Sequence, residues 1–282
     1  MGNLWRRYAA KFCLISLLLA EVALWRHLSW ARTLGYKPLV FLARQRMEWQ
    51  TRDWLVAESE HFRLKYRPED ASIVPVVLET AEEAYVPATE IFHYQPRGKT
   101  LVLIYPDRQS LAQQFGWAAD ESAMGVYWAG VVRILSPLDW LPADHTLSDT
   151  FKAQGPVLHE FSHLLVDELA RGNYPRWLTE GLAQYVERQV TGYQLPGPEP
   201  EDIKQWYSLY ELDTHFDRLP DQAVAYRQSL MMVDYLIDRT GWEGVRRLLL
   251  ELGRGASLEE AIKEATGLEL TQLPAPLFTL SS

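Results

Sequence analysis

The chain has 282 residues, of which 48% are hydrophobic and 12% aromatic, so it is long and apolar enough to fold around a core and is not a disordered protein. Its single cysteine, Cys13, excludes an intramolecular disulfide and a metal site built from cysteines. Residues 1–52 carry nine Lys or Arg and two Asp or Glu, net +7, which leaves 19 basic and 35 acidic residues, net −16, in residues 53–282. This acidic remainder argues against a nucleic-acid partner, whereas the basic segment suits the anionic headgroups of a membrane.

Residues 1–28 combine a basic start with an apolar run from Phe12 to Trp25 that only Ser16 and Glu21 interrupt. Such a run is short for a spanning helix and typical of the hydrophobic part of a signal sequence. Because no Ala-x-Ala-like cleavage site follows it, we predict an uncleaved signal anchor, which makes the protein a single-pass protein of the cell membrane with an extracytoplasmic domain. A cleaved signal peptide, and thus a secreted protein, is one alternative; a helix of a cytosolic protein is another.

Residues 29–56 mix large apolar side chains with basic ones. We predict a basic juxtamembrane linker here, with an amphipathic helix broken at Pro38 as the alternative. The remainder, residues 57–282, is predicted to form one domain. Its first half, residues 57–172, contains the strand patterns, and its second half, residues 173–282, is mainly helical.

Strand and helix patterns alternate in the first half of this domain. Alternating or continuous apolar runs predict strands at 61–66 and 100–105 and a strand or hairpin at 125–134, and helical spacing predicts helices at 71–92 and 107–115. Glycines at both ends of residues 126–129 indicate a bulge, a tight turn or a close approach of the backbone. Residues 138–150, rich in proline and aspartate, are predicted to be a loop in which Asp149 or Thr150 caps the next helix.

The next predicted helix, from Ala153 to Leu169, carries the sequence His159-Glu160-Phe161-Ser162-His163. Residues at i and i+4 lie on the same helix face, so His159 and His163 can offer imidazole nitrogens to one metal ion. Glu160 projects beside the pair and can polarise a water that the metal holds. Zinc suits this arrangement, because catalytic zinc sites use three protein ligands and leave one position to water.

A second helical stretch follows at Trp177–Tyr185 and contains Glu180, one short connection after His163. A neighbouring helix can therefore offer the carboxylate of Glu180 as a third ligand. Gly181 and Ala183 are small, as the close approach of two helices requires.

The two motifs, His159-Glu160-x-x-His163 and Trp177-x-x-Glu180-Gly181-Leu182-Ala183-x-Tyr185, together resemble the gluzincin metallopeptidases, and specifically the small bacterial peptidase MA-like family. The resemblance runs from about Glu58 to the C-terminus. It implies a zincin-like fold, one Zn²⁺ bound by His159, His163 and Glu180, and Glu160 as the general base.

Two departures from related enzymes accompany this resemblance. The spacing from His163 to Glu180 is shorter than in thermolysin-like and aminopeptidase-N-like enzymes, and Gln184 stands where thermolysin-like enzymes carry an acidic residue. The resemblance also implies that the strand within residues 125–134 is an edge strand that pairs with extended substrate backbone. An ordinary sheet strand is the alternative.

Helices are further predicted at 201–210, 223–239, 241–252 and 257–267, the last opened by a capping-box pattern. Tyr226 is the candidate catalytic residue among them. Zinc peptidases need a donor that faces the developing oxyanion, and a tyrosine from a downstream helix provides it in aminopeptidase-N-like gluzincins. By this analogy we predict that role for Tyr226, with a plain core residue as the alternative.

These patterns predict an α+β fold with a small mixed sheet in the N-terminal half, a helical C-terminal half, and the zinc helix at their junction. The predicted function is zinc-dependent hydrolysis of peptide or protein substrates. An endopeptidase is favoured over an aminopeptidase, because no residue marks an acidic site for a substrate amino terminus. The alternatives are a catalytically inactive, zinc-stabilised peptide-binding module at the membrane surface, and a membrane-associated scaffold in which the motif arose by chance.

Overall fold

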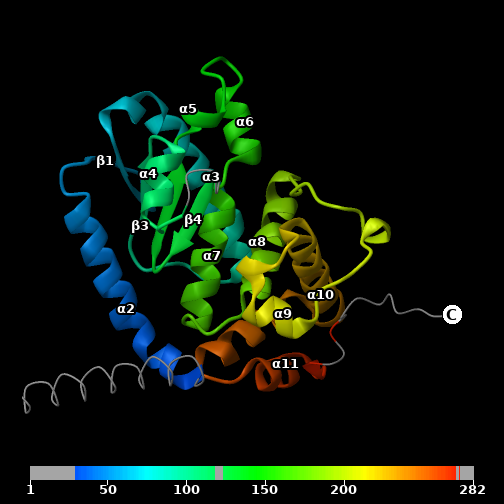
Figure 1. Cartoon of the computed structure of the whole chain (residues 1–282). Helices are drawn as coiled ribbons and strands as arrows, with labels where there is room; N and C mark the ends of the chain where they lie inside the picture. Colours follow the sequence, from blue (N-terminus) through cyan, green and yellow to red (C-terminus); the bar gives the residue numbers. More distant parts are fainter. Residues whose placement is uncertain (1–28, 118–122, 271–272, 274–282) are drawn as a thin grey trace, which may run out of the picture.

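The computed structural model describes residues 29–117, 123–270 and 273 and shows the predicted α+β arrangement (Figure 1). The predicted signal anchor, residues 1–28, lies outside the described residues, as does Cys13 within it. None of the helices in the described part of the chain has the length and apolar character needed to cross a membrane.

A five-stranded mixed sheet forms the centre of the N-terminal half. Its spatial order is β1-β2-β3-β5-β4, with β2, β3 and β5 parallel and each outer strand antiparallel to its neighbour. The strands are β1 (Leu55–Glu58), β2 (Phe62–Tyr66), β3 (Thr100–Tyr105), β4 (Gly125–Trp128) and β5 (Val131–Leu135). The three predicted strands are confirmed, and residues 125–134 form a hairpin that turns at Ala129 and Gly130, both with positive φ.

Both faces of the sheet are covered, as its parallel strands require. The helices α3 (Val74–Phe92) and α7 (Val157–Ala170) share a hydrophobic core with the face that carries Val102 and Ile134. The other face, with Leu101 and Leu103, packs against Met47 of α2 (Ser29–Gln50) and Leu111 of α4 (Arg108–Gln113). A 3-10 turn, Pro68–Ile73, leads into α3. The sequence His159-Glu160-Phe161-Ser162-His163 on α7 therefore lies directly under the sheet.

The predicted linker contains the long helix α2, which runs along one side of the molecule (Figure 1). The break expected at Pro38 was wrong: the helix continues through it. Pro38 is exposed, so water can bond to the carbonyl group that its missing N–H leaves without a partner. The opposite face of α2 buries Tyr36, Ala43 and Met47 against the domain and holds the helix in place.

Two local predictions were also wrong. The loop expected at residues 138–150 contains the end of α5 (Pro137–Trp140) and the start of α6 (Leu147–Gln154), so that Asp149 lies inside α6 and does not cap α7. Instead α7 begins after Pro156 without a side-chain cap.

The helix expected at residues 201–210 is replaced by a 3-10 turn, Pro200–Asp202, and an irregular stretch. Here the side chain of Gln228 accepts from the backbone N–H of Tyr207 and donates to its carbonyl group. These long-range bonds replace the helical ones. The next helix, α9 (Leu209–Thr214), starts only at Ser208, which forms a capping box with Glu211.

The C-terminal half is helical, as predicted. It consists of α8 (Arg176–Thr191), α9, a 3-10 turn at Phe216–Arg218, α10 (Gln222–Gly253) and α11 (Leu258–Thr266). The left-handed φ of Gly241 separates the two predicted helices that make up α10. α8 and α10 approach closely at Gly181, where an added Cβ would lie 2.3 Å from the backbone oxygen of Ser229.

Gly181→Ala is therefore expected to destabilise the protein by about 1–3 kcal/mol, since the added methyl group meets rigid backbone of α10. This loss should exceed the gain of up to about 1 kcal/mol that alanine brings within a helix. Urea unfolding measures the change. The control is Gly197→Ala, where the new Cβ would make an ordinary 3.7 Å contact. Equal midpoints for both variants and the wild type would contradict the close approach.

Candidate metal centre

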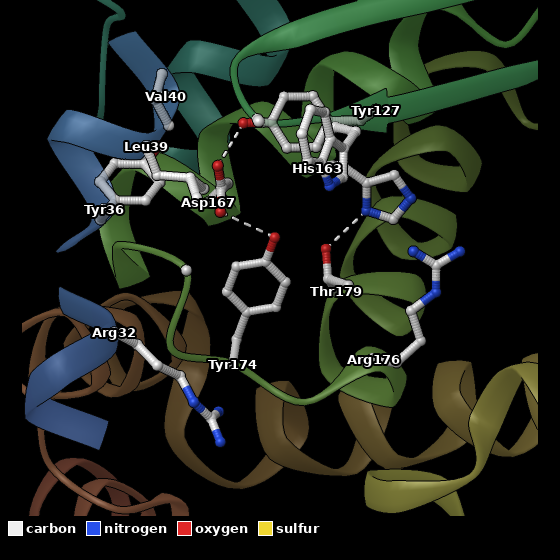
Figure 2. A pocket seen from close by; sticks show the side chains of 13 residues that line it. Arg32, Tyr36, Leu39, Val40, Tyr127, His163, Asp167, Tyr174, Arg176 and Thr179 are labelled. Atoms are coloured by element: carbon white, nitrogen blue, oxygen red, sulfur yellow. Dashed lines mark hydrogen bonds between the residues drawn. The ribbon is translucent and has the colours of Figure 1, made fainter. Parts of the chain in front are cut away.

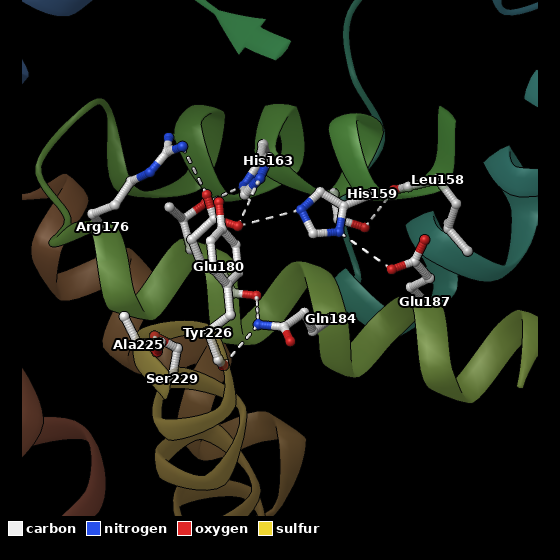
Figure 3. Close-up of polar contacts among 12 residues, drawn as sticks. Leu158, His159, His163, Arg176, Glu180, Gln184, Glu187, Ala225, Tyr226 and Ser229 are labelled. Atoms are coloured by element: carbon white, nitrogen blue, oxygen red, sulfur yellow. Dashed lines mark hydrogen bonds and ion pairs between the residues drawn. The ribbon is translucent and has the colours of Figure 1, made fainter. Parts of the chain in front are cut away.

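The helices α7 and α8 bring the three predicted ligands together (Figure 3). One ligand atom from each of His159, His163 and Glu180 lies within 4.8 Å of the other two. The Nε2 atoms of His159 and His163 lie 3.3 Å and 3.6 Å from Oε2 of Glu180. All three side chains thus direct a potential ligand atom toward one point between the helices.

The outer nitrogen of each imidazole has its own partner, which fixes the orientation of the ring. Nδ1 of His159 lies 3.3 Å from Oε2 of Glu187, and Nδ1 of His163 lies 2.6 Å from Oγ1 of Thr179. Such partners hold the Nε2 atom toward a metal and raise the basicity of the ligand. Both partners come from α8, the helix that also carries Glu180.

Glu187 was not predicted. It follows Glu180 by seven residues, which is two helical turns and places both carboxylates on the same face of α8. That spacing was the signal available in the sequence. Glu187 therefore supplies, one turn later, the acidic group that is missing at position 184. The side-chain amide of Gln184 donates instead to the backbone oxygens of Glu180 and Tyr226, and this second bond links α8 to α10.

Arg176 contacts the second oxygen of the Glu180 carboxylate, with Nη2 at 2.9 Å from Oε1. Burial would raise the pKa of Glu180, but Arg176 and the two histidines hold it well below its ordinary value. Burial would likewise lower the pKa of His159, yet its contacts with Glu180 and Glu187 raise it well above its ordinary value. The centre is a buried cluster of opposite charges.

The donor set fits zinc. Two imidazole nitrogens and one carboxylate oxygen converge, which is the three-ligand pattern of catalytic zinc sites that leave a fourth position open. A structural zinc site is normally closed by four protein ligands. No fourth histidine, cysteine or acidic side chain joins this group among the described residues.

A cavity of about 610 Å³ opens in front of this centre. The edge strand β4 forms one wall, His159 and Glu160 lie in the cavity lining, and Tyr226 of α10 contributes another side. Gly125 lets β4 pass over Glu160, because an added Cβ would lie 2.7 Å from Cγ and Oε1 of that residue. The structure thus brings every predicted site residue to one cavity, and the close backbone approach expected from the glycines is confirmed at Gly125.

Two ionisable groups in this cavity are shifted toward their neutral forms. Burial raises the pKa of the Glu160 carboxyl, against the opposing effect of the histidines. Burial also raises the pKa of Tyr226, so its phenol is protonated at neutral pH and can donate a hydrogen bond. A carboxyl group of increased basicity and a phenol that can donate a hydrogen bond therefore line the same cavity.

A second, smaller cavity of about 220 Å³ lies beside His163 and is walled by α2 (Figure 2). At its centre is Asp167, one turn after His163 on α7. The hydroxyl groups of Tyr127, Tyr174 (at 3.0 Å) and Tyr36 donate to its carboxylate. These tyrosines belong to β4, the α7–α8 connection and α2, so one buried carboxylate joins three segments to α7.

Residues 147–277 match the family model described as the Peptidase MA superfamily, a range that contains both motifs and Tyr226. Among solved structures, the chain is similar to Legionella pneumophila aminopeptidase A in complex with aspartic acid, with 14% identity and a TM-score of 0.44. That match covers 77% of this chain and 26% of the aminopeptidase, so the chain spans about a quarter of its length. No curated protein matches the sequence.

Asp167→Ala is expected to lower stability by about 1–3 kcal/mol for each tyrosine hydroxyl that it leaves buried without an acceptor. Denaturant unfolding provides the measurement. Tyr174→Phe removes a single donor and should cost less, and Asp167→Asn, which keeps an acceptor oxygen, should fall between the alanine variant and the wild type. The cluster has no organising role if Asp167→Ala unfolds at the wild-type midpoint.

Proposed function

We propose that this chain is a peptidase that uses one zinc ion to hydrolyse peptide bonds in extended peptide or protein substrates; the match of residues 147–277 to the family model of the peptidase MA superfamily supports this proposal. The observation that carries the proposal is the convergence of His159, His163 and Glu180 at the floor of a cavity that Glu160 also lines. A zinc ion held by these ligands would supply the Lewis acidity that polarises the attacking water and the scissile carbonyl group.

Glu160 is proposed as the general base. Its carboxylate takes a proton from the attacking water and then passes it to the nitrogen of the leaving amine as the C–N bond breaks. Burial in the cavity raises its pKa, which strengthens it as a proton acceptor. An inactive peptide-binding module would have no use for a base at this position, so the hydrolase is preferred.

Two further elements are proposed to bind the substrate. The strand β4 has no neighbouring strand on its outer side in the described sheet and lines the cavity, so it can pair with extended substrate backbone. Tyr226 lines the same cavity with its phenol protonated, which suits it to donate to the oxyanion as negative charge develops there.

Membrane association is a separate proposal. The basic start and apolar run of residues 1–28 support a signal anchor that holds the domain on the outer face of the cell membrane, with a secreted protein as the alternative.

Metal content and turnover of Glu180→Ala and Glu160→Gln test the proposed mechanism. The wild type and Glu160→Gln should hold about one zinc per chain. Glu180→Ala should lose the zinc, because of the two substituted residues Glu180 is a proposed ligand and Glu160 is not. Hydrolysis of a peptide library by Glu160→Gln should fall by about 10²–10⁴-fold. Normal turnover by Glu160→Gln would refute the role of the base, and a wild type that takes up no zinc would refute the metallopeptidase.

Glu187→Gln should weaken zinc binding by about 10–100-fold, because the amide orients the His159 ring less firmly than the carboxylate at 3.3 Å. Competition with a coloured chelator measures the affinity. Glu243→Gln, at an exposed carboxylate of α10, is the matched control and should bind zinc as the wild type does. The proposed role of Glu187 fails if the two variants have equal affinity.

A further inference from the structure

The outer face of α2 is unusually apolar for a surface of the domain. Four large side chains on it are mostly exposed: Leu34 at 70%, Phe41 at 61%, Leu42 at 65% and Trp49 at 66%. Their spacing places them along one stripe of the helix, opposite the buried residues that hold α2 on the sheet. α2 therefore has two apolar faces, and the domain covers only one of them.

Basic residues flank the exposed stripe. Lys37 and Arg46 are exposed at its sides, and the guanidinium group of Arg52 lies 4.9 Å from the centre of the Trp49 ring. The one acidic residue within α2, Glu48, faces the domain, where Lys65 and Arg63 pair with it. The surface that α2 presents thus combines these four large apolar side chains, with the exposed Gln45 between them, and positive charge at its margins.

We propose that this outer face of α2 lies flat on an anionic lipid surface, with Leu34, Phe41, Leu42 and Trp49 inserted at the level of the headgroups. Apolar side chains enter the interface while flanking lysines and arginines reach the phosphates, which is how amphipathic helices bind membranes. This proposal does not depend on the proposed catalytic function.

The charge of the rest of the chain orients the molecule. Residues 53–282 carry a net charge of −16, so an anionic surface repels the body of the domain and attracts α2. Residues 1–28, with their own apolar run, immediately precede Ser29, so the chain enters α2 from the segment predicted to lie in the membrane. The charge distribution and the position of residues 1–28 directly before α2 therefore both favour the outer face of α2 as the surface that contacts lipid.

The lipid contact lies close to the proposed active site. On its inner side, α2 contributes Tyr36 and Val40 to the small cavity that His163 also lines (Figure 2). The lipid surface and this cavity are thus separated by one helix, about 10 Å thick.

Site-directed fluorescence of the full chain tests the proposal. Cysteine is introduced as Leu42→Cys in a Cys13→Ser background, labelled with an environment-sensitive dye, and the protein is reconstituted with vesicles of phosphatidylcholine and phosphatidylglycerol. The control label is at Tyr210→Cys, where the native side chain is similarly exposed at 69%. Tyr210 belongs to α9, and this helix lies on the opposite side of α7 from α2 in Figure 1. Quencher-bearing lipids then report which label meets the bilayer.

The label at position 42 should shift to shorter wavelength and be quenched several-fold more than the label at position 210. Adding Phe41→Ser and Trp49→Ser should reduce that quenching, as should replacing phosphatidylglycerol by phosphatidylcholine. Equal, weak quenching at both positions overturns the proposal. A shift at position 42 that grows with protein concentration in the absence of lipid also overturns it, in favour of a second copy of the chain as the occupant.

Discussion

The burial of one carboxylate, that of Glu180, determines how the helices of this protein are arranged. An ionised group that is withdrawn from water is tolerated only where cations and donors surround it. Arg176 contacts one of its oxygens, and the imidazoles of His159 and His163 face the other. α8 must therefore lie directly against α7. Gly181, the residue after Glu180, allows the backbone of α10 to approach α8 closely.

The same constraint recurs one turn beyond His163. Asp167 is also a buried carboxylate, and burial raises its pKa, but its surroundings are hydroxyl groups instead of cations. Those hydroxyls come from segments far apart in the sequence. Tyr127 joins β4 to α7, and its oxygen also accepts from the backbone N–H of Gly130, which fixes the turn of the hairpin. These bonds hold β4, which forms one wall of the larger cavity, in a fixed position relative to the histidines on α7.

Features with a local signal could be predicted from the sequence. The facing histidines follow from helical spacing, the strands from alternation, and the division of α10 from Gly241. What could not be predicted depends on distant contacts: α2 continues past Pro38 because its inner face meets strands β3 and β5, and residues near Tyr207 stay irregular because Gln228 bonds to their backbone. The Asp167 cluster has no local pattern at all, since its donors are separated by up to 138 positions, from Tyr36 to Tyr174.

The packing of α2 has a consequence for where the chain can be cut. The side chain of Val40 packs against Gly130, where an added Cβ would lie only 2.7 Å from Cγ1 of Val40. Met47 covers one face of the sheet. A fragment that starts at residue 53 would expose that face and take one donor away from Asp167. The part of the chain that folds as one unit therefore has to include α2 at least from Tyr36 onward. A protease that sheds the intact domain from its N-terminal segment has to cut upstream of that residue.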